Sequence, residues 1–167
     1  MNACGILMLA AIVAVSPTPP VKKHCQIPCG IYGDKIRIDL LMEDAATIEK
    51  GMKKIGEFTK AGNFNQAVRW ITNKDEHAGK IQRMVADYWL AQRIKAPKDS
   101  ADAKARAKYL RQLELMHGIN VAAMKCKQTT DVAHVAKLRS LAMEFARTYF
   151  KPEDLKHIEE HHGSRGR

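Results

Sequence analysis

The sequence predicts an all-α protein, an antiparallel up-down-up-down four-helix bundle, and three observations lead to this prediction. Apolar residues recur at helical spacing in four successive segments of the chain. Aromatic residues make up only 6% of the 167 residues, whereas the helix formers Ala, Met, Lys, Gln and Glu are plentiful. The connections between the four segments are short, and short connections join helices that pack as antiparallel neighbours.

The first two helices are expected on either side of a glycine-containing break. The first follows Gly33, and its predicted buried stripe consists of Ile36, Leu40, Leu41, Ile48, Met52 and Ile55. Gly56 and Gly62 bracket the break that follows. The second helix should begin near Asn63, a favourable N-cap, and end before Pro97, which cannot continue a helix. Its predicted buried stripe consists of Phe64, Val68, Ile71, Ala78, Ile81, Val85 and Tyr88.

The third and fourth helices are predicted from the same spacing. Asp99 and Ser100 offer an N-cap for the third, whose stripe consists of Ala103, Ala107, Leu110, Leu113, His117, Val121 and Met124. Gly118 in this helix costs about 1 kcal/mol relative to Ala but leaves room for a neighbouring helix. Residues 129–131 should cap the fourth helix, whose inward residues are Val135, Leu138, Leu141, Ala142, Phe145 and Tyr149.

The chain divides into four parts: a leader over residues 1–23, a short segment without helical pattern over 24–32, the bundle over 33–151 and a polar tail over 152–167. The tail is expected to hold a short helix near residues 153–161 and to end in disorder. His117 on the third stripe is expected to be a satisfied core histidine, and Cys126 an ordinary helix residue.

The leader is expected to be removed from the mature chain. Its apolar run over residues 6–15 is too short to span a bilayer and suits a secretory signal peptide, although no Lys or Arg precedes it. A proline-containing linker follows, and then Lys22 and Lys23, which resemble a proteolytic cleavage point directly before His24. The leader favours export to the periplasm or the extracellular space, with the cytoplasm as the alternative. No stable membrane insertion of the mature chain is expected.

The formal net charge of +10 would attract a negatively charged partner. Lys and Arg are spread over every predicted helix, and no nucleic-acid recognition motif accompanies them, so no nucleic-acid partner is expected. Attraction of a small anion explains the charge better, and an ordinary solvated surface is the alternative.

The segment from His24 to Tyr32 carries the chemistry of the chain. It reads His-Cys-Gln-Ile-Pro-Cys-Gly-Ile-Tyr and places two thiols and an imidazole within six residues. Soft sulfur donors together with nitrogen donors can close around one transition metal. The C-x3-C spacing of Cys25 and Cys29 is neither that of a disulfide scaffold nor the C-x-x-C of redox and zinc motifs. Pro28 presets a turn between the two cysteines, and Gly30 permits an unusual backbone angle after it.

This segment resembles the metal hook of nickel superoxide dismutases, which carry H-C-x-x-P-C-G-x-Y at the start of the mature chain. His24, Cys25, Pro28, Cys29, Gly30 and Tyr32 all fall in register with that motif. The resemblance implies one nickel ion per subunit, bound after cleavage by the His24 amine and imidazole, the Cys25 amide nitrogen and the thiolates of Cys25 and Cys29. It also implies disproportionation of superoxide to dioxygen and hydrogen peroxide by Ni(II)/Ni(III) cycling, in a homohexamer of four-helix bundles, after a maturation protease exposes His24.

The resemblance also implies roles for three further residues. Tyr32 corresponds to the family's gating tyrosine, which excludes larger molecules and orders water beside the metal. Asp39, in Arg-Ile-Asp, corresponds to the acid that supports the axial imidazole. Tyr88, in Asp-Tyr, corresponds to a tyrosine that hydrogen-bonds the gating tyrosine. Without the resemblance, Tyr32 simply packs on the bundle, Asp39 is an exposed helix acid and Tyr88 is a core tyrosine.

Two other functions fit parts of the same pattern. A non-catalytic helical bundle that binds Ni or Cu would use the same hook without turnover. A thiol–disulfide module would use Cys25 and Cys29 without metal, but the chain lacks the βαβ pattern of thioredoxin-like proteins.

Overall fold

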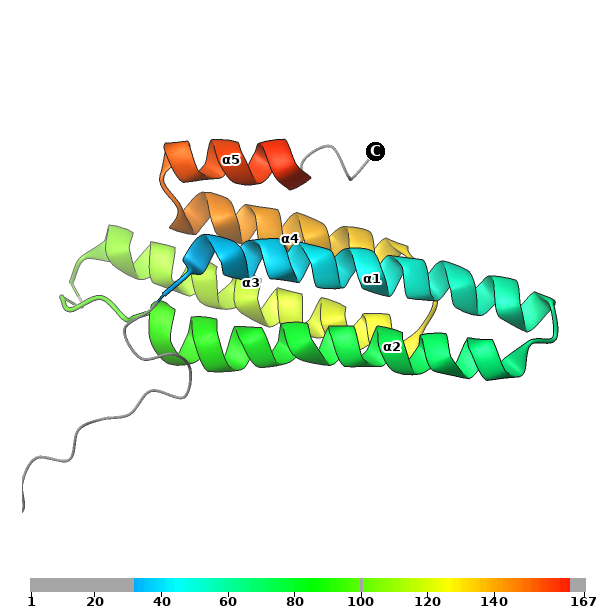
Figure 1. Cartoon of the computed structure of the whole chain (residues 1–167). Helices are drawn as coiled ribbons and strands as arrows, with labels where there is room; N and C mark the ends of the chain where they lie inside the picture. Colours follow the sequence, from blue (N-terminus) through cyan, green and yellow to red (C-terminus); the bar gives the residue numbers. More distant parts are fainter. Residues whose placement is uncertain (1–31, 100, 163–167) are drawn as a thin grey trace, which may run out of the picture.

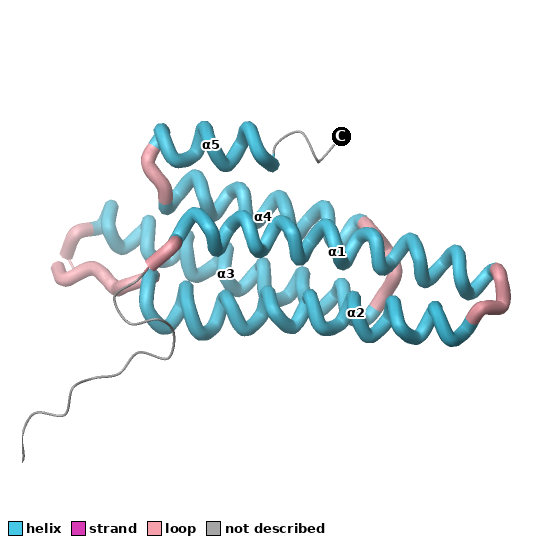
Figure 2. Tube along the Cα trace, in the orientation of Figure 1, coloured by secondary structure: helices cyan, strands magenta, loops and turns pink. Residues whose placement is uncertain are grey.

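The computed structural model describes residues 32–99 and 101–162, and within these ranges every regular element is helical (Figure 2). The elements are α1 (Asp34–Lys60), α2 (Phe64–Arg83), the π-helical segment η1 (Met84–Arg93), α3 (Ala103–Gln128), α4 (Ala133–Tyr149) and α5 (Pro152–His162). The prediction of an all-α fold is confirmed. The hook residues His24, Cys25, Pro28, Cys29 and Gly30, and the leader before them, lie outside the described residues.

The four long helices lie side by side, and consecutive helices run in opposite directions (Figure 1). α1 packs mainly on α2, and α3 packs mainly on α4. Contacts of α2 with α3 and of α1 with α4 join these two pairs of helices around a shared core. As a result, the start of α1, the end of η1 and the end of α4 lie at the same end of the molecule (Figure 1).

The core consists of apolar side chains from every helix, including α5. Its largest fully buried members are Trp89, Tyr88, Phe145, Ile38, Leu41, Ile48, Ile81, Leu115, Met116, Ile119, Leu138 and Ile158. In α4, four of the six predicted inward residues are buried (Val135, Leu138, Ala142 and Phe145), while Leu141 and Tyr149 are partly buried against the core.

The predicted stripes of the first three helices are partly wrong. In α1 the core face carries Ile38, Leu41, Met42 and Ala45, whereas Ile36 is 61% exposed and Leu40 38% exposed. In α2 only the C-terminal half of the predicted stripe is buried: Phe64 is 67% exposed, Val68 59% and Ile71 41%. Both helices carry apolar residues on more than one face, so helical spacing alone does not identify the face that enters the core.

In α3 the predicted register is displaced from the buried face. The buried residues are Gln112, Leu115, Met116, Ile119, Ala122, Ala123 and Cys126, whereas Leu110, His117 and Met124 are exposed. The expectation that His117 is a core histidine is therefore wrong. Gly118 does admit a neighbour, because a Cβ added there would lie 3.2 Å from Cδ1 of Leu141 in α4.

Of the two glycines predicted to bracket the break after the first helix, only Gly62 lies in the turn between α1 and α2. α1 continues through Gly56 to Lys60, which corrects the predicted break. Gly62 has φ +71°, a left-handed conformation that side chains disfavour. The amide of Gly62 donates to the carbonyl of Thr59, and that of Asn63 to the carbonyl of Phe58. This is the Schellman arrangement, which satisfies the last carbonyls of a helix.

Side chains accept hydrogen bonds from backbone amides at the starts of α2, α3 and α4. Oδ1 of Asn63 accepts a hydrogen bond from the Gln66 amide at the start of α2, as predicted. At the start of α3, Asp102 rather than Asp99 is the N-cap, because its Oδ1 accepts from the Ala105 amide. Oδ1 of Asp131 accepts from the Ala133 amide at the start of α4.

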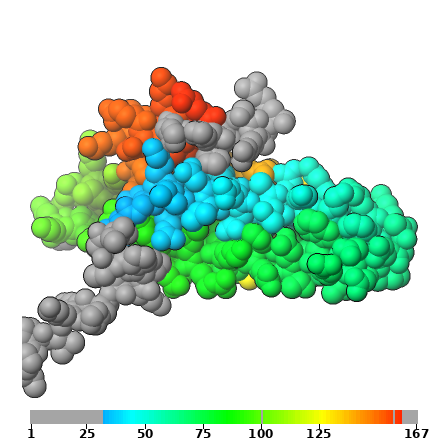
Figure 3. All heavy atoms as spheres, in the orientation of Figure 1, coloured from blue at the N-terminus to red at the C-terminus, as the bar shows by residue number. Residues whose placement is uncertain are grey.

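The C-terminal α5 forms a fifth helix beside the bundle. It contacts α1 and lies on the outside of the molecule (Figures 1 and 3). Its Ile158 is fully buried. Arg147 of α4 forms an ion pair with Glu159 of α5. None of the described helices combines the length and the apolar character that a membrane span requires.

Candidate active site at the start of α1

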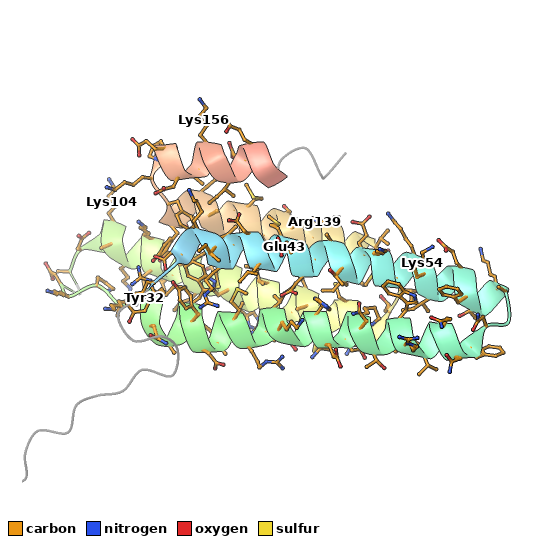
Figure 4. The ribbon with its side chains drawn as sticks, viewed as in Figure 1. Tyr32, Glu43, Lys54, Lys104, Arg139 and Lys156 are labelled. Carbon is orange, nitrogen blue, oxygen red and sulfur yellow. The ribbon has the colours of Figure 1, made fainter. Side chains whose placement is uncertain are left out.

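Tyr32 is the part of the hook that the structure describes, and it lies where the chain enters α1 (Figure 4). Tyr32 is 38% exposed. The Tyr32 hydroxyl donates to Oε1 of Gln92 at 3.2 Å. Its ring lies under the guanidinium of Arg93, with 4.4 Å from Cζ to the ring centroid. The Tyr88 ring meets it edge-on, with 6.1 Å between the ring centroids.

The three residues that surround Tyr32 all come from η1. In this segment the backbone turns are wider than in an α-helix, as shown by the 2.8 Å hydrogen bond from the Ile94 amide to the Trp89 carbonyl, five residues back. In an α-helix, residues five apart point about 140° away from each other. The wider π-helical turn therefore lets Tyr88, Gln92 and Arg93 share one face.

Asp34, the first residue of α1, accepts four hydrogen bonds from three side chains. Its Oδ1 accepts from the Tyr88 hydroxyl at 2.5 Å and from Nε of Arg93 at 2.8 Å. Its Oδ2 accepts from Nη2 of Arg93 at 2.6 Å and from the Tyr149 hydroxyl at 2.8 Å. The carboxylate thus joins α1 to η1 and to the end of α4.

The electrostatics of this cluster favour an ionised Asp34. Partial burial raises the pKa of Asp34, but the hydrogen bonds from Arg93, Tyr88 and Tyr149 outweigh it, so the net pKa is lowered. Burial and then the bond to Asp34 raise the pKa of Tyr149 to about 12, and the same two causes raise the pKa of Tyr88. The bond to Asp34 raises the pKa of Arg93. Both tyrosines therefore stay protonated donors at neutral pH.

Aromatic side chains of η1 and α4 pack against one another at this end of the molecule. The Trp89 ring meets those of Tyr88, Phe145 and Tyr149 edge-on, with centroids 4.9 to 5.1 Å apart. Trp89, Tyr88 and Phe145 are fully buried. Because aromatic pairs of this geometry are favourable beyond their buried area, they fix the backbone of η1 and the end of α4.

The predicted supporting residues are placed as follows. Tyr88 is buried and touches Tyr32 through its ring, while its hydroxyl donates to Asp34. Its predicted hydrogen bond to the Tyr32 hydroxyl stays a prediction. Asp39 is half-buried in α1, five residues after Asp34. Its predicted partner His24 lies outside the described residues, as do the ligands Cys25 and Cys29, so these roles also stay predictions.

Sequence reasoning missed Asp34, Gln92, Arg93 and Tyr149 as members of the site. Asp34 directly follows Gly33 at the predicted start of the first helix, and its partners lie 54 to 115 positions away along the chain. No local spacing connects residues at such distances. The departure of η1 from α-helical geometry, which brings Gln92 and Arg93 to Tyr32, also leaves no periodic signal in the sequence.

Two other side chains with polar end groups, Lys74 and Cys126, are buried. Lys74 is only 2% exposed, although it is a charged residue. Its Nζ donates to the carbonyls of Cys126 and Lys127 at 2.7 Å each. Cys126 is a buried core residue, and burial raises the pKa of its thiol to about 11, which makes it unreactive.

Within residues 32–99 and 101–162, no group of three or more His, Cys, Asp or Glu residues is arranged to hold a metal ion.

Comparison with known proteins places this site in a family. A family model described as nickel-containing superoxide dismutase matches residues 19–153, which include the whole segment from His24 to Tyr32 and all four long helices. No curated protein and no solved structure gives a significant match to the chain. The matched range covers most of the 167 residues, and the chain belongs to the nickel-containing superoxide dismutase family, whose members are oxidoreductases.

Proposed function

We propose that this chain is a nickel-dependent superoxide dismutase that becomes active when cleavage before His24 exposes the N-terminal amine. The observation that carries the proposal is the family match, which includes the hook, together with the structured surroundings of Tyr32 directly after it. The substrate is the superoxide anion, and the products are dioxygen and hydrogen peroxide.

The donor set of the hook fits nickel. The thiolates of Cys25 and Cys29 are soft anionic donors, and the amine and imidazole of His24 and the amide nitrogen of Cys25 supply nitrogen. These residues would hold one nickel ion per subunit. When bound, nickel supplies the one-electron redox chemistry, because thiolate and amidate donors bring its Ni(II)/Ni(III) potential into a usable range.

The other site residues orient and enclose. Pro28 and Gly30 shape the turn that brings the two cysteines together. Tyr32 excludes larger molecules from the open face and orders water with its hydroxyl, which the bond to Gln92 already orients. Tyr88 backs the Tyr32 ring, and Asp39 holds the His24 imidazole in one orientation.

The scaffold we propose is an up-down-up-down four-helix bundle that assembles into a homohexamer. Two observations support assembly. The N-terminal half of α2 leaves Phe64, Val68 and Ile71 exposed at helical spacing, and such contiguous apolar surface is typical of subunit contacts. At the other end of the molecule, Ile36 near the start of α1 is also exposed. A hook whose sequence carries no helix or strand pattern would be held more firmly between subunits.

The leader supports maturation by proteolysis before His24 and export from the cytoplasm, with a cytoplasmic enzyme as the alternative. The positive charge of the chain supports attraction of superoxide toward the site.

The test compares two chains that differ by one residue: one that begins at His24 and one that keeps Lys23 before it. Both are loaded with nickel, and superoxide decay is followed directly. Only the chain with a free His24 amine should disproportionate superoxide, and Cys25→Ser or Cys29→Ser in that chain should abolish the activity while helical circular dichroism is kept.

Two outcomes contradict the proposal. Tight nickel binding by the His24 chain without turnover would favour the alternative, a non-catalytic Ni/Cu-binding helical bundle. Thiol–disulfide exchange without metal that tolerates His24→Ala would favour a thiol–disulfide module.

A further inference from the structure

Arg93 contacts both Asp34, the first residue of α1, and the ring of Tyr32. Its guanidinium forms a two-pronged ion pair with Asp34, with Nε–Oδ1 2.8 Å and Nη2–Oδ2 2.6 Å. The same guanidinium lies over the Tyr32 ring at 4.4 Å. We propose that Asp34 and Arg93 together form a positioning pair that holds the Tyr32 ring in one place at the edge of the active site. The inference rests on the proposed function, in which Tyr32 guards that site.

Asp34 is suited to fix the plane of the guanidinium. A carboxylate matches the two parallel N–H donors of arginine, and this geometry sets orientation as well as distance. The remaining acceptor positions of Asp34 are occupied by the hydroxyls of Tyr88 and Tyr149. The carboxylate cannot turn without breaking contacts to η1 and to α4, so the plane of Arg93 is held from two elements.

The arrangement around Tyr32 is better explained by positioning than by stability. A tyrosine that is 38% exposed at the start of a helix would ordinarily sample several rotamers. Here Arg93 contacts its face, Tyr88 its edge and Gln92 its hydroxyl. Three contacts from three directions restrict both the rotation and the tilt of the ring.

The structure offers a matched control in the Arg139–Glu49 ion pair. Arg139 of α4 pairs with Glu49 of α1 at 2.5 Å, and its side chain is 20% exposed, close to the 24% of Arg93. Glu49 lies 15 residues after Asp34, which is about 22 Å along α1. Figure 4 shows Arg139 well away from Tyr32. Arg139→Gln therefore removes a similar helix-to-helix ion pair without touching the site.

The first measurement is ¹⁹F NMR of the full chain labelled with 3-fluorotyrosine, in which Tyr32→Phe identifies the Tyr32 signal. This measurement needs neither nickel nor activity. Arg93→Gln should move the Tyr32 signal most of the way toward its value in the unfolded chain. Arg93→Lys, which keeps the charge but not the planar fork, should give an intermediate shift. Arg139→Gln should leave the Tyr32 signal in place.

The second measurement is the kcat/KM for superoxide of the processed, nickel-loaded variants. Arg93→Gln should lower it about three- to tenfold, the range expected for loss of one cation–π contact, with unchanged nickel content. Arg139→Gln should leave it unchanged. Asp34→Asn provides a second route to the same loss if Arg93→Gln does not fold.

The outcomes separate this inference from the proposed function. An unmoved Tyr32 signal in Arg93→Gln and in Asp34→Asn overturns the positioning pair, whatever the activity. Lower activity with an unmoved Tyr32 signal also overturns it. A nickel-loaded wild type without dismutase activity overturns the proposed function, while the NMR comparison still decides whether Asp34 and Arg93 position Tyr32.

Discussion

At the residue scale, the Asp34 carboxylate accepts four hydrogen bonds in the site. One half-buried carboxylate receives donors from Arg93, Tyr88 and Tyr149, so it links three helical segments that are distant in sequence. A carboxylate of this kind is costly to replace, because each partner would lose a charge-assisted hydrogen bond.

Asp34→Asn should lower the free energy of unfolding by about 2 kcal/mol at pH 7, since the ion pair is lost but some neutral hydrogen bonds remain. The pKa of Asp34 is lowered in the folded chain, so its contribution is fully present above the unfolded value of about 4. It should be lost as the pH falls through the folded value. Urea unfolding of both proteins between pH 7 and pH 3 checks this.

The stability difference between wild type and Asp34→Asn should therefore be constant above about pH 5 and shrink below about pH 4. A difference that is small at pH 7, or that grows on acidification, would show that the Asp34 carboxylate does not hold this end of the bundle.

At the element scale, the ends of the helices decide much of the local structure. Lys74 in α2 is buried, and its ammonium group donates to two carbonyls at the C-terminal end of α3, Cys126 and Lys127. It also pairs with Asp75 at 2.7 Å. A cation at the negative end of a helix is favourable, so a lysine buried here acts as a cap donated by a neighbouring helix.

Lys74→Met keeps the length of the side chain but leaves the two carbonyls of α3 without this donor. We expect it to destabilise the protein by about 2–3 kcal/mol, the cost of unsatisfied buried acceptors. Lys80→Met, at an exposed position of the same helix, should change stability by less than about 0.5 kcal/mol. Equal effects of the two substitutions in thermal unfolding would refute the capping role.

Two glycines of α1 and its connection should respond in opposite ways to alanine. Gly56 lies inside α1, and no atom lies within 4 Å of an added Cβ, so Gly56→Ala should stabilise by about 0.5–1 kcal/mol. Gly62 has a positive φ, so Gly62→Ala should destabilise by about 1 kcal/mol despite the open space around it. Chemical denaturation of the two variants gives the signs, and a stabilising Gly62→Ala would contradict the turn geometry.

The comparison of sequence and structure is clearest at this scale. Helix existence followed from apolar spacing, caps such as Asn63 and the break before Pro97, and all four long helices were predicted. The faces were harder, because α1, α2 and α3 carry apolar residues such as Ile36, Phe64 and Leu110 outside the core. Spacing identifies a helix, but the choice of the buried face depends on neighbours that the sequence does not reveal.

At the scale of the whole molecule, the residues that support Tyr32 come from three separate parts of the chain. The sequence motif from His24 to Tyr32 was sufficient to predict the metal and the family. The cluster behind Tyr32 could not be predicted, because Asp34, Arg93 and Tyr149 meet only when α1, η1 and α4 pack together. A short motif predicts the metal ligands, while tertiary packing brings together the residues that surround Tyr32.

The exposed stripe of α2 makes a prediction about assembly. Phe64→Lys combined with Val68→Lys should shift the native mass in light scattering from a hexamer toward smaller species, with helical circular dichroism unchanged. Val132→Lys, at an isolated apolar position that is 42% exposed, serves as the control and should leave the mass unchanged. A hexamer that survives the double substitution would place the subunit contacts elsewhere.

The central claim is that proteolysis before His24 converts this chain into a nickel enzyme. The most direct test is N-terminal sequencing of the protein isolated from its own cells, joined to metal analysis and superoxide decay on the same sample. The account predicts His24 as the first residue, one nickel ion per chain and dismutase activity. An active protein that retains residues before His24, or a nickel-loaded chain beginning at His24 that leaves superoxide untouched, would contradict it.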